Sequence, residues 1–119
     1  SAHSGSWSNY TKGIIDTDEL IYKLWDFIES DSIYSGSTSL FATNDHGRHL
    51  DNIGNGFISH GDNCDGCRHI NLFAFGPDFK RNIIIDNERE QIDIPATIAE
   101  LLKLNIPNCN GEVIRELFK

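Results

Sequence analysis

Apolar side chains recur every three or four positions in the first part of the chain. Between residues 8 and 29 they are Tyr10, Ile14, Ile21, Leu24, Trp25 and Ile28. The charged residues of this stretch fall mostly between them: Lys12, Asp16, Asp18, Glu19, Lys23 and Asp26. This period is typical of an amphipathic helix with one buried face. We therefore predict a helix over residues 8–29, followed by a serine-rich loop.

Three later segments have the composition of short strands. Residues 38–43 and 70–75 have apolar centres, and residues 82–86 form a shorter apolar run. Apolar residues that follow one another, rather than alternating with polar ones, are typical of parallel strands buried on both faces. We therefore expect these segments to lie in a mostly parallel sheet.

A second helix is predicted over residues 93–104. Asp93 can cap its start, and Pro95 suits the first turn, where its missing N–H costs nothing. A last short helix is expected within residues 111–119. The order helix, strand, loop, strand, strand, helix predicts an α/β fold.

The loop between the first two strands is the most unusual segment. Residues 47–68 are polar and rich in glycine, and a loop of this length inside a small domain usually has a function. Open α/β sheets bind ligands at the carboxyl ends of their strands, where this loop would begin. Functional side chains are therefore expected in this loop and its flanks.

Length and charge restrict the possible functions. With 119 residues, the chain is predicted to be a single α/β segment over residues 1–119. The net charge of -8 argues against non-specific nucleic-acid binding, which needs a basic face. No apolar run approaches the roughly 20 residues that span a bilayer. The chain begins in a loop-like stretch without Met, so we expect it to be a fragment of a larger protein.

Three cysteines are too few for a disulfide framework. Cys64 and Cys67 have C-x-x-C spacing, but a second such pair, which would complete a structural zinc site, is missing. Cys109 stands alone. The spacing favours either a local disulfide or two plain loop thiols.

Histidine and aspartate gather in the loops that flank the predicted strands. Asp45 and His46 follow the first strand directly, His60 lies in the long loop, and His3 lies near the start. The alternative is that Asp45 caps a turn and each histidine is an ordinary loop residue. Taken together, imidazole and carboxylate groups favour a divalent metal, with zinc or manganese expected first.

Four segments, in order, resemble the alkaline phosphatase superfamily. Residues 43–47, Thr-Asn-Asp-His-Gly, resemble its T-x-D-H-G signature. Residues 59–63 and 71–80 are similar to the H-G-x-D-N and G-Y-G-P-x-F-K segments of its phosphodiesterase branch. Residues 92–102 resemble its D-I-x-P-T-I-x-x-L-L helix, and His3-Ser4-Gly5 with Tyr10 resembles the end of D-x-x-G-H-x-G-x-x-Y.

This resemblance implies the C-terminal part of a sandwich with helices on a mostly parallel sheet, and a site with two divalent ions. Asp45 and His46 would bind the ion that also touches the nucleophile, and His60 and His3 would bind the other ion. Zinc is expected, with manganese, magnesium or calcium as alternatives. The remaining candidates are His69, a rival for the role of His60, and Arg48 and His49, which could face an anionic substrate or play a supporting role.

The resemblance also shows what this sequence lacks. In the family, the nucleophilic Ser or Thr lies far upstream, and the Asp four residues before the histidine that corresponds to His3 would precede residue 1. We therefore expect no catalytic nucleophile in this chain. The expected parent is a hydrolase of phosphate or sulfate esters, located outside the cytoplasm. The alternatives are a sulfatase with a single calcium ion and a non-catalytic fragment that binds metal or substrate.

Overall fold

The computed structural model describes residues 1–119, which form two compact units. The first unit is Ser1–Gly76 and the second is Pro77–Lys119. The prediction of a mostly parallel sheet is wrong. The structure contains a single two-stranded sheet, in which β1 (Leu40–Thr43) and β2 (Leu72–Phe75) run antiparallel. The fold is therefore not the parallel-sheet sandwich of the alkaline phosphatase superfamily.

The connection between the two strands accounts for this correction. Two parallel strands need a crossover that returns to the starting end of the sheet, usually through a helix that packs on it. Between β1 and β2 the chain forms only the 3-10 turn η2 (Gly56–Ile58) and the single-turn helix α2 (Asp65–Arg68). The register pairs Leu40 with Phe75 and Thr43 with Leu72. Residues 44–71 therefore leave and re-enter the same end of the hairpin.

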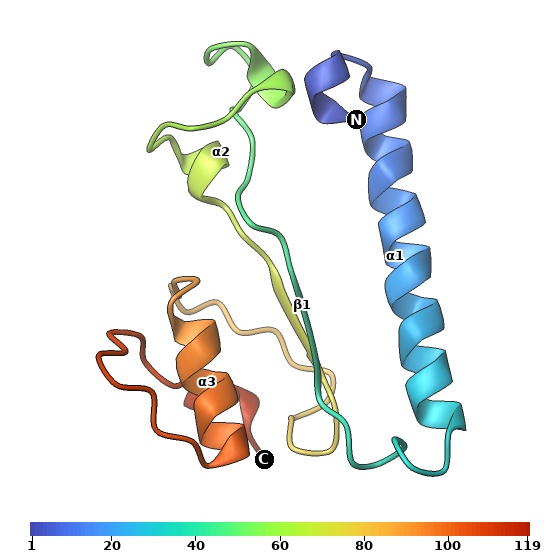
Figure 1. The fold of residues 1–119 in the computed structure, drawn as a ribbon. Coiled ribbons are helices and arrows are strands. Elements are labelled where there is room, and N and C mark those ends of the chain that lie inside the picture. Colours follow the sequence, from blue (N-terminus) through green and yellow to red (C-terminus); the bar gives the residue numbers. More distant parts are fainter. The chain divides into compact units, whose positions relative to one another are not determined.

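The long first helix was predicted correctly. Helix α1 spans Trp7–Ser30, and the Ser6 side chain caps it by accepting a hydrogen bond from the N–H of Asn9. Ile28 is buried, and the Trp25 ring lies 5.6 Å from that of Phe75 in β2. This pair places the C-terminal half of α1 beside the hairpin, as Figure 1 shows. No helix in the structure is both long enough and apolar enough to cross a membrane.

The second unit is built on helix α3 (Asp93–Leu102), which matches the second predicted helix apart from its last two residues. Phe79 and Thr97 are fully buried. The Thr97 hydroxyl donates to the carbonyl of Asp93 and accepts from the N–H of Ile114, so the C-terminal segment is bound to the helix. The Asp93 carboxylate accepts from the N–H of Glu112, 2.8 Å away.

Two smaller predictions for the second unit had different outcomes. The segment 82–86 is not a strand, and Ile84 within it is 96% exposed. Near the C-terminus, η3 (Arg115–Leu117) is a 3-10 turn inside the range where a short helix was expected. The apolar composition of 82–86 thus does not produce a strand, since no partner strand pairs with it.

Candidate metal sites

The loop 44–71 is held together by its own backbone. Asn44 joins its two ends, because its Oδ1 accepts from the N–H of Asn71 at 2.7 Å and its Nδ2 donates to the carbonyls of His46 and His69. The N–H of Gly47 donates to the carbonyl of Cys67 at 2.9 Å. A Cβ on Gly47 would lie 1.9 Å from the carbonyl oxygen of Gly66. Glycine is therefore required by close packing of the two segments.

Aromatic side chains bring the N-terminus to this loop. Trp7 and Tyr10 of α1 lie 5.0 and 5.6 Å, ring centre to ring centre, from Phe57 in the turn η2. The preceding 3-10 turn η1 (Ala2–Ser4) contains the buried Ala2 and lies against the same turn. Because these contacts fix the first residues, His3 is carried to the part of the loop that contains His60.

Three of the predicted histidines and Asp45 meet at this place. The rings of His46 and His60 stack with their centres 3.7 Å apart, and the ring of His3 lies 5.2 Å from that of His60. Asp45 Oδ2 is 3.4 Å from Nε2 of His46. We call His3, Asp45, His46 and His60 the histidine cluster. Its members come from three separate segments of the sequence, and the fold alone makes them neighbours.

The hydrogen bonds of His46 prepare one of its nitrogens for a cation. Its Nδ1 lies 2.8 Å from the carbonyl oxygen of Gly47, which can only accept, so Nδ1 carries the proton. In a neutral ring with its proton on Nδ1, the other nitrogen, Nε2, would be available to a cation, and it lies near the carboxylate of Asp45. The N···O distance of 3.4 Å compares with about 3.3–3.4 Å between two ligands of one tetrahedral zinc ion.

The electrostatics of the cluster favour neutral imidazole at its centre. Partial burial lowers the pKa of His60, and the neighbouring His46, Arg48 and His3 lower it further, whereas Asp45 acts in the opposite direction. Neutral imidazole is the form that binds a metal. Arg48 donates a hydrogen bond to the His3 ring. Its Nη1 lies 3.3 Å from His3 Nε2, and a guanidinium can only donate. Arg48 would have to move before His3 could bind an ion through that nitrogen.

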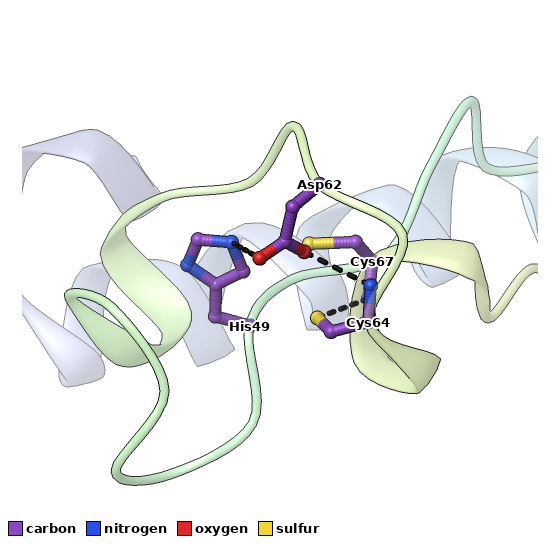
Figure 2. Close-up of side chains that lie close together, drawn as sticks. All are labelled: His49, Asp62, Cys64 and Cys67. Carbon is purple, nitrogen blue, oxygen red and sulfur yellow. Dashed lines mark hydrogen bonds and ion pairs between the residues drawn. The ribbon is translucent and has the colours of Figure 1, made fainter.

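The other two predicted histidines lie elsewhere. His69 is exposed, and its backbone carbonyl, rather than its ring, takes part in the loop's hydrogen bonding. His49 belongs to a second group of side chains with Asp62, Cys64 and Cys67, which we call the thiol cluster. Figure 2 shows the His49 imidazole and the Asp62 carboxylate facing each other, with both thiols close to the carboxylate.

The thiol cluster could hold a metal ion. Its four potential ligand atoms all lie within 4.8 Å of one another, and His49 Nε2 is 3.3 Å from Asp62 Oδ2. Both cysteines are free thiols in the structure, as is Cys109. A metal site here was not predicted, because the C-x-x-C pair lacks a second cysteine pair. In the structure, His49 and Asp62 supply the two ligands that a second cysteine pair would otherwise provide. The position of Asp62, two residues before Cys64, could have indicated this site in the sequence.

Asp62 and Cys64 shift each other's ionisation. Hydrogen bonds from the thiol and the N–H of Cys64 lower the pKa of Asp62 to about 2. The same hydrogen bond raises the pKa of Cys64, because only the protonated thiol can donate it to the carboxylate. Without a cation the proton therefore stays on sulfur, and a bound cation would reverse this preference.

No family model, curated protein or solved structure matches this chain.

Proposed function

We propose that this chain is the C-terminal part of a metal-dependent hydrolase of phosphoric or sulfuric esters, whose Ser or Thr nucleophile lies outside this sequence. The observation that supports this most is the histidine cluster, where His3, Asp45, His46 and His60 converge from three segments. The order of motifs that resembles the alkaline phosphatase superfamily adds support. The sheet does not, because it is antiparallel and has two strands.

The donors of the histidine cluster fit divalent ions. Three imidazoles and a carboxylate are ligands suited to zinc and manganese, and two ions would share them with ligands from outside this sequence. Bound ions would lower the charge on the ester and activate the nucleophile. The chain's own contribution is to hold the ligands in place through Asn44, Gly47 and the Trp7–Tyr10–Phe57 contacts.

Arg48 is suited to bind the substrate anion. Its guanidinium lies at the edge of the cluster, 3.3 Å from His3, and offers several donors to ester oxygens. Two imidazoles, His46 and His60, at the centre of the cluster favour a two-ion phosphate site over a sulfatase site with one calcium ion. The preferred substrate class is therefore a phosphate ester.

Manganese binding gives the most direct test. We expect the purified chain to bind Mn²⁺, followed by the loss of the free-ion EPR signal, and Asp45→Ala or His60→Ala to weaken this binding at least about 10-fold. His69→Ala is the matched control, because its ring lies outside both clusters, and it should bind as the wild type does. Equal binding by all three variants would refute the assignment.

Hydrolysis is tested on the natural polypeptide that contains this sequence. Bis-p-nitrophenyl phosphate should be turned over faster than p-nitrophenyl sulfate, and Asp45→Ala should lower kcat/KM by more than about 100-fold. The reverse preference would indicate a sulfatase. Metal binding without turnover of either ester would indicate a non-catalytic binding protein.

A further inference from the structure

The thiol cluster has the composition of a closed zinc site. Two cysteine sulfurs, one histidine nitrogen and one carboxylate oxygen are ligands that zinc accepts, and four protein ligands are typical of structural rather than catalytic zinc. Soft sulfur ligands also disfavour magnesium, calcium and manganese. The histidine cluster, with nitrogen and oxygen donors only, differs from it in this respect.

The spacing of the donors agrees with this composition. Ligand atoms about 2.0–2.1 Å from a tetrahedral zinc ion lie about 3.3–3.4 Å apart. His49 Nε2 and Asp62 Oδ2 are 3.3 Å apart, and every pair in the cluster lies within 4.8 Å. Small side-chain rotations would therefore bring all four atoms onto one ion.

The imidazole of His49 provides an independent observation. Its side chain is only 11% exposed, and its buried Nε2 has no hydrogen-bond partner although it faces the Asp62 carboxylate. The other nitrogen, Nδ1, lies 3.1 Å from the Ser59 hydroxyl, as expected for the outer contact that orients a metal-bound histidine. A Cβ on Gly54 would lie 2.7 Å from Nδ1, so this ring is closely enclosed. Such a nitrogen is costly to bury unless a proton or a metal ion joins it to the carboxylate, and a metal ion would also engage the two nearby thiols.

The backbone also supports the two sulfurs. The N–H of Cys67 donates to Cys64 Sγ at 3.4 Å, because α2 begins directly after Cys64. Gly66 lies so close to Arg48 that a Cβ would be 2.3 Å from its carbonyl oxygen. This contact brings the segment that contains His49 against the one that contains the thiols.

We propose that His49, Asp62, Cys64 and Cys67 bind one structural zinc ion that closes the loop 44–71. The site is separate from the histidine cluster and does not depend on the proposed hydrolase activity. It would nevertheless support that activity, because His46 lies three residues before His49 and His60 lies two residues before Asp62. Closing the loop would fix both histidines in position.

Cobalt substitution distinguishes this site from the histidine cluster. We expect Co²⁺ added to the reduced chain to give an intense thiolate-to-cobalt absorption band in the near ultraviolet and visible bands of tetrahedral strength. Cys64→Ser and Cys67→Ser should abolish the thiolate band or weaken cobalt binding by at least about 100-fold. Cys109→Ser is the matched control and should retain the spectrum, as should Asp45→Ala and His60→Ala.

A second measurement on the wild-type chain guards against variants that fail to fold. X-ray absorption of the zinc-loaded protein should show two sulfur and two nitrogen or oxygen neighbours, with Zn–S at about 2.3 Å. Zinc with only nitrogen and oxygen neighbours would overturn the proposal, as would a Cys64–Cys67 disulfide in protein that cannot take up zinc after reduction. If Mn²⁺ binding at the histidine cluster fails while the thiolate band persists, only the proposed function is refuted.

Discussion

Different interactions stabilise each of the two units of this protein. In residues 77–119, the buried side chains of Phe79, Thr97 and Ile114 form a core around α3. In residues 1–76, the buried side chains are small or few, namely Ala2, Ile28 and Cys67. Burial of apolar surface is the main stabilising contribution in most domains. The second unit follows this rule more closely than the first.

Helix α1 makes the contrast plain. Seven of its large apolar side chains are 47% exposed or more: Trp7, Ile14, Ile15, Leu20, Tyr22, Leu24 and Phe27. The loop 44–71 of the same unit is instead fixed by hydrogen bonds of Asn44, by close glycine contacts and, in our proposal, by bound ions. The comparison teaches that the unit with the candidate sites depends on polar and close backbone contacts, whereas the other depends on an apolar core.

The largest expected effect is on the core of the second unit. Phe79→Ala should lower the free energy of unfolding of residues 77–119 by about 3–5 kcal/mol, because it removes a fully buried ring. Hydrogen exchange of peptides from α3 should report this loss. Both tryptophans lie in the first unit, so tryptophan fluorescence should show little change there. An equal loss of stability in both units would show that they unfold as one.

Removal of zinc is expected to affect the other unit, with a smaller effect. At a free zinc concentration 100 times the dissociation constant, bound zinc would stabilise the first unit by about 2.7 kcal/mol. Chelation should therefore shift the urea unfolding curve followed by tryptophan fluorescence, and leave hydrogen exchange in α3 unchanged. In Cys67→Ser, chelation should have no further effect. A wild-type curve that does not respond to zinc would argue against a stabilising ion.

The smallest effect concerns acid stability of the second unit. Hydrogen bonds from the Arg89 guanidinium lower the pKa of Glu116 to about 2, from an ordinary value of 4.5. A lowered carboxyl pKa stabilises the fold above pH 4.5, and this contribution is lost as the pH falls from 4.5 toward 2. Glu116→Gln should therefore reduce the loss of α3 protection over this range.

Glu100→Gln is the control for this effect. Glu100 also pairs with an arginine, Arg115, but both side chains are more exposed, so its substitution should change acid stability less. If Glu100→Gln changed the pH dependence as much as Glu116→Gln, the Arg89 pair would have no special role.

Helices could be predicted from this sequence because their signals are local. The period of apolar residues in α1 and α3 and the Ser6 cap of α1 lie within or next to each segment. The predicted cap at Asp93 is wrong, because Asp93 is the first residue of α3 and the N-cap position is Ile92, which makes no side-chain cap. Strand pairing is not local, and the runs at 38–43 and 70–75 do not specify whether they pair parallel or antiparallel. The prediction of a parallel sheet failed for that reason, and 82–86 remained outside any sheet.

The same distinction applies to the sites. Asp45 and His46 are neighbours in sequence, so their joint role could be proposed without a structure. Only the tertiary structure brings His3 and His60 to them, through contacts of Trp7 and Tyr10 with Phe57. It also brings His49 and Asp62 to the C-x-x-C pair. In the sequence this pair supplies only two of the four ligands that a zinc site needs.

The sequence by itself therefore determined the two helices, the presence of a long polar loop and the chemical types of the candidate ligands. These follow from short-range periodicity and from side-chain chemistry, which do not depend on distant residues. Only the tertiary structure decided the direction of strand pairing and the division of the ligands into a histidine cluster and a thiol cluster. Both depend on contacts between residues far apart in the chain, whose closure costs entropy that only the whole fold can offset.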